Sequence, residues 1–424
     1  MASTQTVGLG REAQRIASTV ERLDRERAVA RLWDGDASLW AEDAATQAAI
    51  RSRLGWLTIP RTMARHTQSL GAFAEEVFEA GFTHVLLLGM GGSSLFAEVC
   101  RNTFSASRRH ADLAVLDTTD PTAIRLHQRR CAPERLAVIV SSKSGTTAEI
   151  QALAAYFYGQ LAAAGGAPGN HCLAITDVGT PLEKQAEAWA FRRTFVHGPD
   201  SGMDVGGRFS ALTYFGLVPA ALLGVDLDTL LNRALEMLER CGPARAPAEN
   251  PAAQLAAVVG SLAQAGREKV TLLTPPALQS FGTWLEQLIA ESLGKSGTGV
   301  VPIFGEPVQA VSGDGQDRMV IELQLASEPD AAIERRVQAL QALGVPVVRI
   351  QWRDRYDLGA EVVKWEVATA LAGFVIGVNP FDEPNVKESK DRTNALLARY
   401  ATEGRLEREE PWWCGEGIEL CGAE

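Results

Sequence analysis

A loop of seven residues, Ser141 to Thr147 (SSKSGTT), carries side chains suited to binding an anion. Five of them are hydroxyl residues, and they surround Lys143 and a single glycine. The apolar run before the loop, Leu136 to Val140, predicts a buried strand, and Thr147 stands where a helix would begin, with Glu149 in its first turn. Backbone N–H groups and the helix dipole favour phosphate at such a position. The pattern therefore predicts a phosphate cradle, and an ordinary polar loop is the alternative.

A second loop has the same placement, directly after a buried strand predicted for Thr83 to Leu88. The loop, Gly89 to Ser94, is GMGGSS, in which glycines let the backbone approach a ligand closely. Its spacing differs from the GxGxxG of dinucleotide sites, although Asp117 ends the next predicted strand where a ribose-binding acid would lie. Because the chain offers two hydroxyl-rich loops, we favour a phosphate monoester as the ligand over a dinucleotide.

Two charged residues could carry out chemistry beside these loops. Glu291 lies seven residues after Trp284, at the edge of the apolar stripe of a predicted helix, and Gln287 precedes it by one turn on the same side. Arg208 follows two glycines where a strand gives way to a helix. A partly buried carboxylate can act as a base, and an arginine can stabilise an oxyanion. From these residues alone, a structural glutamate in an ion pair and a solvated arginine remain alternatives.

Strands and helices alternate from residue 72 onward, which predicts an α/β fold with parallel sheets. Further buried strands are predicted at Leu113–Leu116, His171–Thr176, Arg193–Val196, Val270–Leu273, Val300–Phe304, Met319–Leu325 and Val345–Ile350. Helices are predicted at 251–265, 278–293, 331–342 and 358–377. A Pro- and Ala-rich stretch near residue 245 separates two similar lobes. We therefore expect a helical lead-in over residues 1–60, domains over 61–245 and 246–400, and a tail over 401–424.

Composition narrows the possible partners of this chain of 424 residues. Its 41 basic and 52 acidic residues give a net charge of −11, so no broad basic surface is available for nucleic acid. No apolar run reaches the length of a membrane span, and no basic start followed by an apolar segment suggests a signal peptide. The six cysteines show neither CxxC nor zinc spacing, so we expect no metal and a cytoplasmic location with reduced thiols.

Five motifs occur here in the order and approximate spacing of the phosphoglucose isomerases. Along the chain they are GMGGSS, VSSKSGTT, VGGRFS, ESLGK and NPFDEPNVKESK. The chain resembles that family over about residues 55 to 395, and its lead-in is similar to the isomerase half of bacterial bifunctional transaldolase/phosphoglucose isomerases. The resemblance implies two sugar-isomerase (SIS) domains, each a flavodoxin-like sheet with flanking helices. It implies interconversion of glucose 6-phosphate and fructose 6-phosphate through a cis-enediolate, without a metal or redox cofactor, in a homodimer.

The resemblance also assigns roles residue by residue. It places sugar-phosphate contacts at Gly92, Ser93, Ser142, Lys143, Ser144 and Thr147, and supporting positions at Glu149 and Gln287. Glu291 corresponds to the base that moves a proton between C2 and C1, and Arg208 to the residue that stabilises the enediolate. Lys390 corresponds to the lysine associated with opening of the sugar ring.

Two positions depart from the family pattern. Asp317 stands where family members usually place a ring-opening histidine, after the GEP…GQ segment, and all six histidines lie in the first half of the chain. Glu383 replaces the glutamine of the family's NPFDQ motif. We expect ring opening to rely on Lys390 with Asp317 or water, or else to be slow, so that the open-chain sugar is the better substrate.

Two other functions stay open at this point. One is isomerisation of another sugar phosphate, including dual glucose and mannose specificity. The other is a non-catalytic sensor that binds sugar phosphate and regulates a partner. A sensor is expected to have lost its base and to carry an effector segment, whereas Glu291, Arg208 and Lys390 are all present. The missing histidine is the feature that favours the sensor.

Overall fold

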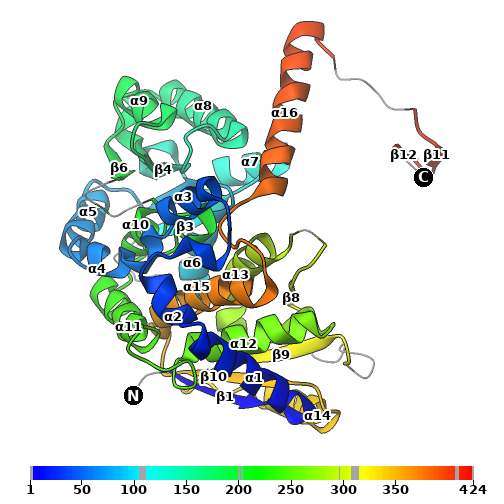
Figure 1. Ribbon diagram of the computed structural model, residues 1–424. Helices are drawn as coiled ribbons and strands as arrows, with labels where there is room; N and C mark the ends of the chain where they lie inside the picture. Colours follow the sequence, from blue (N-terminus) through cyan, green and yellow to red (C-terminus); the bar gives the residue numbers. More distant parts are fainter. Residues whose placement is uncertain are drawn as a thin grey trace. The chain divides into compact units, whose positions relative to one another are not determined.

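The computed structural model describes residues 3–104, 111–198, 201, 204–295, 297–306, 315–405 and 410–422 (Figure 1). Pro307, in the segment where the family histidine is expected, lies outside these residues. The chain forms two compact units, Met1–Phe381 and Asp382–Glu424. None of the helices in the described part of the chain combines the length and apolar composition needed to cross a membrane.

The first sheet of the larger unit is parallel and five-stranded, in the order β3-β2-β4-β5-β6. Its strands are β2 (His84–Leu88), β3 (Asp112–Leu116), β4 (Leu136–Ser141), β5 (Cys172–Asp177) and β6 (Arg193–His197). The connecting helices are α6 (Leu95–Thr103), α7 (Pro121–Gln128), α8 (Ala148–Ala163) and α9 (Pro181–Ala188). This is the flavodoxin-like order, in which ligands bind beyond the carboxyl ends of the strands. The strands predicted from continuous apolar runs are confirmed, and all six residues of β4 are buried.

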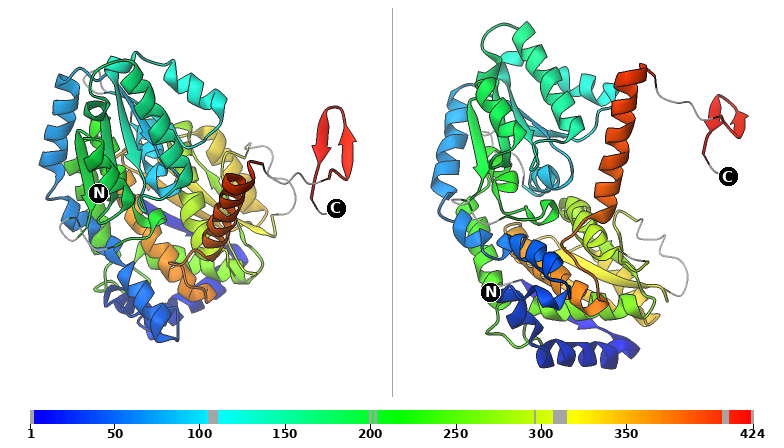
Figure 2. Two further views of the ribbon diagram at one scale, coloured as in Figure 1. Left: turned by 90° about the horizontal axis from the view of Figure 1, so that it is seen from above. Right: turned by 45° about the horizontal axis from the view of Figure 1, so that its top comes forward.

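The second sheet has the order β1-β10-β9-β7-β8. Figure 2 shows the chain from two further sides. Four strands are parallel: β7 (Lys269–Leu273), β8 (Val301–Ile303), β9 (Arg318–Leu325) and β10 (Val347–Trp352). The accompanying helices are α12 (Pro251–Gln264), α13 (Gln279–Leu293) and α14 (Ala331–Ala342). We propose that these two sheets with their helices are the two predicted lobes. The expected α/β fold of two SIS-type sheets flanked by helices is confirmed.

The N-terminal region contains a strand that the sequence analysis did not predict. β1 (Thr4–Gly8) pairs antiparallel with β10 and completes the second sheet. The expected helices follow it: α1 (Ala13–Arg25), α2 (Ala28–Trp33) and α3 (Ala44–Ser52). β1 is short and partly exposed, so its residues carry little apolar pattern, and the unpaired edge of β10 determines its conformation.

One long helix, α15 (Asp357–Ile376), forms the centre of the larger unit and packs on α12 and on α11 (Leu227–Arg240). It is buried along almost its whole length, as expected for a helix that is apolar on all sides. Two of its charged side chains are paired inside the core, with Lys364 Nζ 2.7 Å from Glu361 Oε1. The helix ends at Gly377, which has a left-handed backbone conformation, and the chain then enters the motif Asn379–Pro380–Phe381.

The smaller unit consists of α16 (Pro384–Glu403) and a hairpin of β11 (Trp413–Gly415) and β12 (Ile418–Leu420). Every residue of α16 is at least partly exposed, including Leu396, Leu397 and Tyr400. Lys390 lies in this helix, and its side chain is exposed.

Candidate active site

The predicted arginine and the predicted base are in direct contact. Arg208 Nη1 lies 3.1 Å from Glu291 Oε1, although the two residues are 83 positions apart in the sequence. Arg208 belongs to a single helical turn, Gly207–Phe209, and Glu291 lies in the last turns of α13. The Arg208 side chain is 2% exposed, and that of Glu291 is 21% exposed. The contact therefore joins a buried cation to a carboxylate that a ligand can still reach.

Two further hydrogen bonds hold the guanidinium of Arg208. Its Nε donates to Ser292 Oγ at 2.7 Å, and its Nη2 donates to the carbonyl of Pro380 at 2.6 Å. The next residue, Phe209, is buried and stacks on Trp56 with ring centroids 5.3 Å apart. Because both the side chain and its neighbour are held, the guanidinium has a fixed orientation toward Glu291.

The GMGGSS loop packs against the two segments that carry this pair, the Arg208 turn and α13. A Cβ atom added to Gly92 would lie 2.0 Å from the carbonyl oxygen of Gly207, so glycine is required where the loop meets the Arg208 turn. Gly91 has φ +54°, and a Cβ there would lie 2.7 Å from Gln287 Nε2. Gln287 Oε1 is buried without a hydrogen-bond partner among the described residues. The loop, the Arg208 turn and α13 thus meet at one place.

The hydroxyl-rich loop Ser141–Thr147, which we call the phosphate loop after its predicted ligand, is connected to the GMGGSS loop by a buried hydrogen bond. Ser141 Oγ donates to the carbonyl of Ser93 at 2.7 Å. Within the phosphate loop, Ser142 Oγ and Thr147 Oγ1 are 3.1 Å apart, and Ser144 Oγ accepts from the Thr146 amide at 3.3 Å. Ser144 is exposed, Ser142 is buried, and Thr147 immediately precedes α8. The predicted strand, loop and helix N-terminus are therefore all present.

Lys143 makes contacts that the sequence analysis did not foresee. Its Nζ lies 2.5 Å from Asp177 Oδ2 and 2.7 Å from Asp204 Oδ1. Burial opposes the charged amine, but the two carboxylates raise the pKa of Lys143 above its ordinary value. Asp177 ends β5 and Asp204 lies four residues before Arg208, so Lys143 ties the phosphate loop to the Arg208 segment. The signal available in the sequence was the position of Asp177 at the end of a predicted strand.

The remaining predicted residues belong to other elements than the pair of Arg208 and Glu291. Glu149 is half-buried in the first turn of α8. Asp317 precedes β9, where its carboxylate pairs with Lys269, and this hydrogen bond lowers the pKa of Asp317. Lys390 belongs to the smaller unit. The roles in ring opening that the resemblance gives to Asp317 and Lys390 stay predictions.

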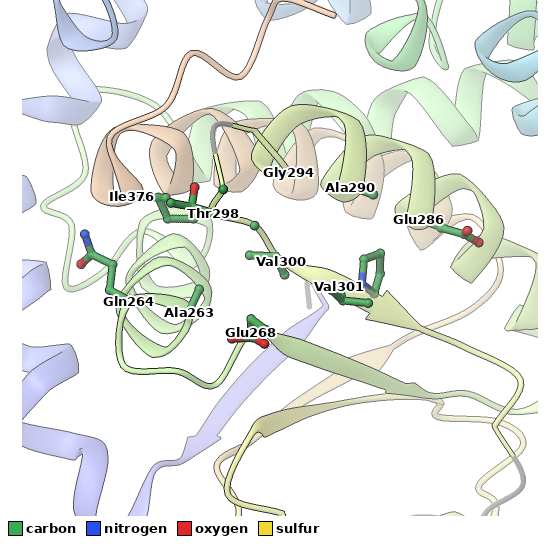
Figure 3. A pocket seen from close by; sticks show the side chains of 13 residues that line it. Ala263, Gln264, Glu268, Glu286, Ala290, Gly294, Thr298, Val300, Val301 and Ile376 are labelled. Atoms are coloured by element: carbon green, nitrogen blue, oxygen red, sulfur yellow. The ribbon is translucent and has the colours of Figure 1, made fainter. Parts of the chain in front are cut away.

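A groove of about 940 Å³ lies beside α13 (Figure 3). The residues of α13 that line it, Glu286 and Ala290, together with Gly294 after its end, follow one another at helical spacing. Gln287 and Glu291 are each one position further along, which turns them by about 100° around the helix axis. The lining of this groove includes none of the predicted site residues, so the groove is distinct from the face of α13 that carries Glu291.

The arrangement suits proton transfer at a carbon next to a carbonyl group. A carboxylate can remove and return a proton, a buried guanidinium can stabilise the oxyanion that forms, and hydroxyl-rich loops can hold a phosphate. In the described part of the chain, no three His, Cys, Asp or Glu side chains come together as a metal site. Two flavodoxin-like sheets that combine these groups define the class of sugar-phosphate isomerases.

Comparison with known proteins identifies the family within this class. The model of the family "Phosphoglucose isomerase" matches residues 61–303. The glucose-6-phosphate isomerase of Rubrobacter xylanophilus is 30% identical over 393 residues, which cover 81% of this chain and 89% of the relative. That of Enterococcus faecalis is 28% identical over 402 residues, with 81% and 87% covered. The chain belongs to the phosphoglucose isomerase family.

Comparison with solved structures supports the description of the fold. A hypothetical protein from Thermus thermophilus is 25% identical, with a TM-score of 0.77, and the match covers 93% of this chain and all of that one. A glucose-6-phosphate isomerase from Chlamydia trachomatis is 19% identical, with a TM-score of 0.68 and 87% and 78% covered. The first match extends the likeness to nearly the whole of this chain.

Proposed function

We propose that this protein interconverts glucose 6-phosphate and fructose 6-phosphate. The observation that carries the proposal is the 3.1 Å contact between the buried guanidinium of Arg208 and Glu291, in a member of the phosphoglucose isomerase family. This contact gives the chain the two groups that aldose–ketose isomerisation needs. A non-catalytic sensor would have no need to keep a reachable carboxylate beside a buried arginine.

In the proposed reaction, Glu291 removes the proton from C2 of the open-chain aldose. The electron pair moves to the carbonyl oxygen O1, which gives a cis-enediolate, and the hydroxyl proton of O2 is transferred to O1. Glu291 then returns the carbon-bound proton to C1, and the carbonyl group of the ketose forms at C2. Arg208 stabilises the oxyanion that forms on O1 or O2. The loops at Gly92–Ser93 and Ser142–Thr147 fix the phosphate, so that C1 and C2 stay within reach of one carboxylate.

The proposed activity is tested by fructose 6-phosphate turnover in an assay coupled to glucose-6-phosphate dehydrogenase. We expect turnover by the purified protein without an added metal or cofactor, and the same assay in reverse tests glucose 6-phosphate. Mannose 6-phosphate is tested in parallel, because comparable turnover of both aldoses would establish dual specificity. Tight binding of fructose 6-phosphate with no turnover in either direction would replace the isomerase with a sensor.

Ring opening is proposed to depend on Lys390, with Asp317 or water as its partner. We expect Lys390→Ala to lower kcat/KM for cyclic fructose 6-phosphate by about 100-fold, the lower end of the range for general acid–base catalysis. The 5-deoxy analogue lacks the hydroxyl that closes the ring, so its turnover is expected to be the same in wild type and variant. Asp317→Asn is compared in the same way. Equal loss with both substrates, or no loss with either, would contradict a role of Lys390 in ring opening.

We propose that the protein is a homodimer, as the family resemblance implies. The support from the chain itself is an uncovered apolar face on α16, where Leu396, Leu397 and Tyr400 are each about half exposed. Sedimentation equilibrium gives the oligomeric state directly, and a monomer at micromolar concentration would overturn the proposal.

A further inference from the structure

Three consecutive backbone carbonyls beside the site each accept a hydrogen bond from a basic side chain. Lys295 Nζ donates to the carbonyl of Asn379 at 2.5 Å, and Arg208 Nη2 donates to that of Pro380 at 2.6 Å. Arg53 Nη1 donates to the carbonyl of Phe381. We call the segment Asn379–Phe381 the carbonyl turn. It follows α15 closely, where the partial negative charge of a helix C-terminus favours nearby cations.

The three basic side chains come from distant parts of the chain. Arg53 follows α3, Arg208 lies in its own helical turn, and Lys295 follows the end of α13. Lys295 and Arg208 are 8% and 3% exposed. The carbonyl turn therefore accepts hydrogen bonds from two segments of the site. One follows α13, the helix of the proposed base, and the other carries Arg208.

The carbonyl turn is itself rigid. Asn379 Oδ1 accepts a hydrogen bond from the amide of Phe381 at 3.0 Å, which closes the turn. The ring of Phe381 is buried against Trp40 and Phe209, with centroid distances of 5.0 and 5.5 Å. A rigid acceptor keeps the guanidinium of Arg208 from turning away from Glu291.

The acceptors in this turn are neutral, and this affects the charge of the site. A carbonyl oxygen offsets part of the cost of burying a cation but does not cancel its charge. The turn therefore holds basic side chains at the site without placing a carboxylate of its own beside the phosphate and the enediolate. Both of these anions gain from positive charge held nearby in a partly buried site.

We propose that Lys295 and the carbonyl turn position Arg208, and that Lys295 is a positioning residue of this active site. The carbonyls of Asn379 and Pro380 belong to adjacent peptides. When Lys295 is removed, the carbonyl of Asn379 loses this charged donor, and the turn is then held mainly from the side of Phe381. The adjacent carbonyl of Pro380 can shift, so that it holds Nη2 of Arg208 less firmly. The effect of Lys295 on an enediolate would thus pass through Arg208. This inference rests on the proposed function, because it takes Arg208 to be the group that stabilises the enediolate.

The test is a double-mutant cycle in the full-length protein, read by calorimetric binding. The probe is 5-phospho-arabinonohydroxamate, a five-carbon phosphorylated hydroxamate whose planar anion resembles the enediolate. We expect Lys295→Met to weaken its binding by about tenfold, the loss typical of one charge-assisted hydrogen bond. In an Arg208→Lys background, Lys295→Met is expected to cause no further loss, because coupled residues are not additive. Inorganic phosphate is expected to bind with the same affinity in every variant.

The controls separate positioning from a general loss of structure. Lys295→Arg, which keeps a charged donor, is expected to restore binding of the hydroxamate. Arg240→Met removes a similar bond from a basic side chain to a carbonyl, that of Ser3, and is expected to leave binding unchanged. If Lys295→Met fails to fold, Lys295→Gln, which keeps an N–H donor but no charge, takes its place in the cycle.

Equal losses in the wild-type and Arg208→Lys backgrounds would overturn the proposal, because Lys295 would then act independently of Arg208. An equal loss of hydroxamate and phosphate binding would overturn it as well. The cycle measures binding and not turnover, so it tests Lys295 separately from the proposed function. A protein that binds the hydroxamate but does not isomerise fructose 6-phosphate would contradict the proposed function, and the cycle would still show whether Lys295 acts through Arg208.

Discussion

Replacing Glu291 with glutamine is expected to lower kcat for fructose 6-phosphate by about 10³-fold or more and to leave its affinity within a few-fold of wild type. Glutamine keeps the size of the side chain and can accept a hydrogen bond from Arg208 through its amide oxygen. It has no basic oxygen for the C2 proton, and general base catalysis contributes about 10²- to 10⁴-fold. The measurement is steady-state turnover in the coupled assay, with ligand affinity from calorimetry.

Glu286→Gln is a matched control on the same helix. Glu286 is exposed and lines the groove beside α13, on a different face from Glu291. It is expected to retain wild-type turnover, so an equal loss in both variants would indicate disturbance of α13 rather than loss of a base. Full turnover of Glu291→Gln would remove Glu291 from the mechanism. The exchange of the C2 proton of glucose 6-phosphate with solvent deuterium, followed by NMR, should fall together with kcat.

Replacing Arg208 with lysine is expected to have the second-largest effect, a loss of about 10²- to 10³-fold in kcat. This is the range observed when one preorganised oxyanion donor is removed. Lysine keeps the positive charge, but it cannot reach Glu291, Ser292 and Pro380 at the same time, as the planar guanidinium does. KM for fructose 6-phosphate is expected to change little, because the phosphate contacts assigned to the two loops remain.

A matched control for Arg208→Lys is Arg101→Lys. Arg101 pairs with Glu98 within α6 through two hydrogen bonds of 2.6 and 2.9 Å, so the same chemical change is made in another ion pair. It is expected to keep wild-type kcat. A variant Arg208→Lys that raises KM and leaves kcat unchanged would indicate that Arg208 binds the ground state of the sugar equally well, and would contradict its role in stabilising the enediolate.

The sequence by itself determined the elements and the chemistry of the loops. Buried strands such as β4 and β5 are specified by short, continuous apolar runs, a local property that the sequence displays directly. The hydroxyl-rich loop before α8 and the glycines of GMGGSS are equally local. The order of five motifs also placed the chain in its family, and the match of the family model over residues 61–303 confirmed that assignment.

Tertiary structure decided which of these residues meet. The pairing of β1 with β10 joins residues more than 330 positions apart, and the five residues of β1 contain no pattern that predicts it. The resemblance gave Arg208 and Glu291 separate roles, whereas their direct contact and the bonds of Arg208 to Ser292 and Pro380 became known from the folded chain. Lys143 is a similar case, since its partners Asp177 and Asp204 come from two other segments.

The physical reason lies in the range of the interactions. Apolar periodicity and loop composition act within a few residues, so they can be recognised along the chain. Ion pairs and hydrogen bonds between side chains depend on which segments the packing of α13, α15 and the two sheets brings within about 3 Å of one another. The carbonyl turn shows the difference most clearly. Its motif could be recognised in the sequence, but the three cations that it binds became known only from the folded chain.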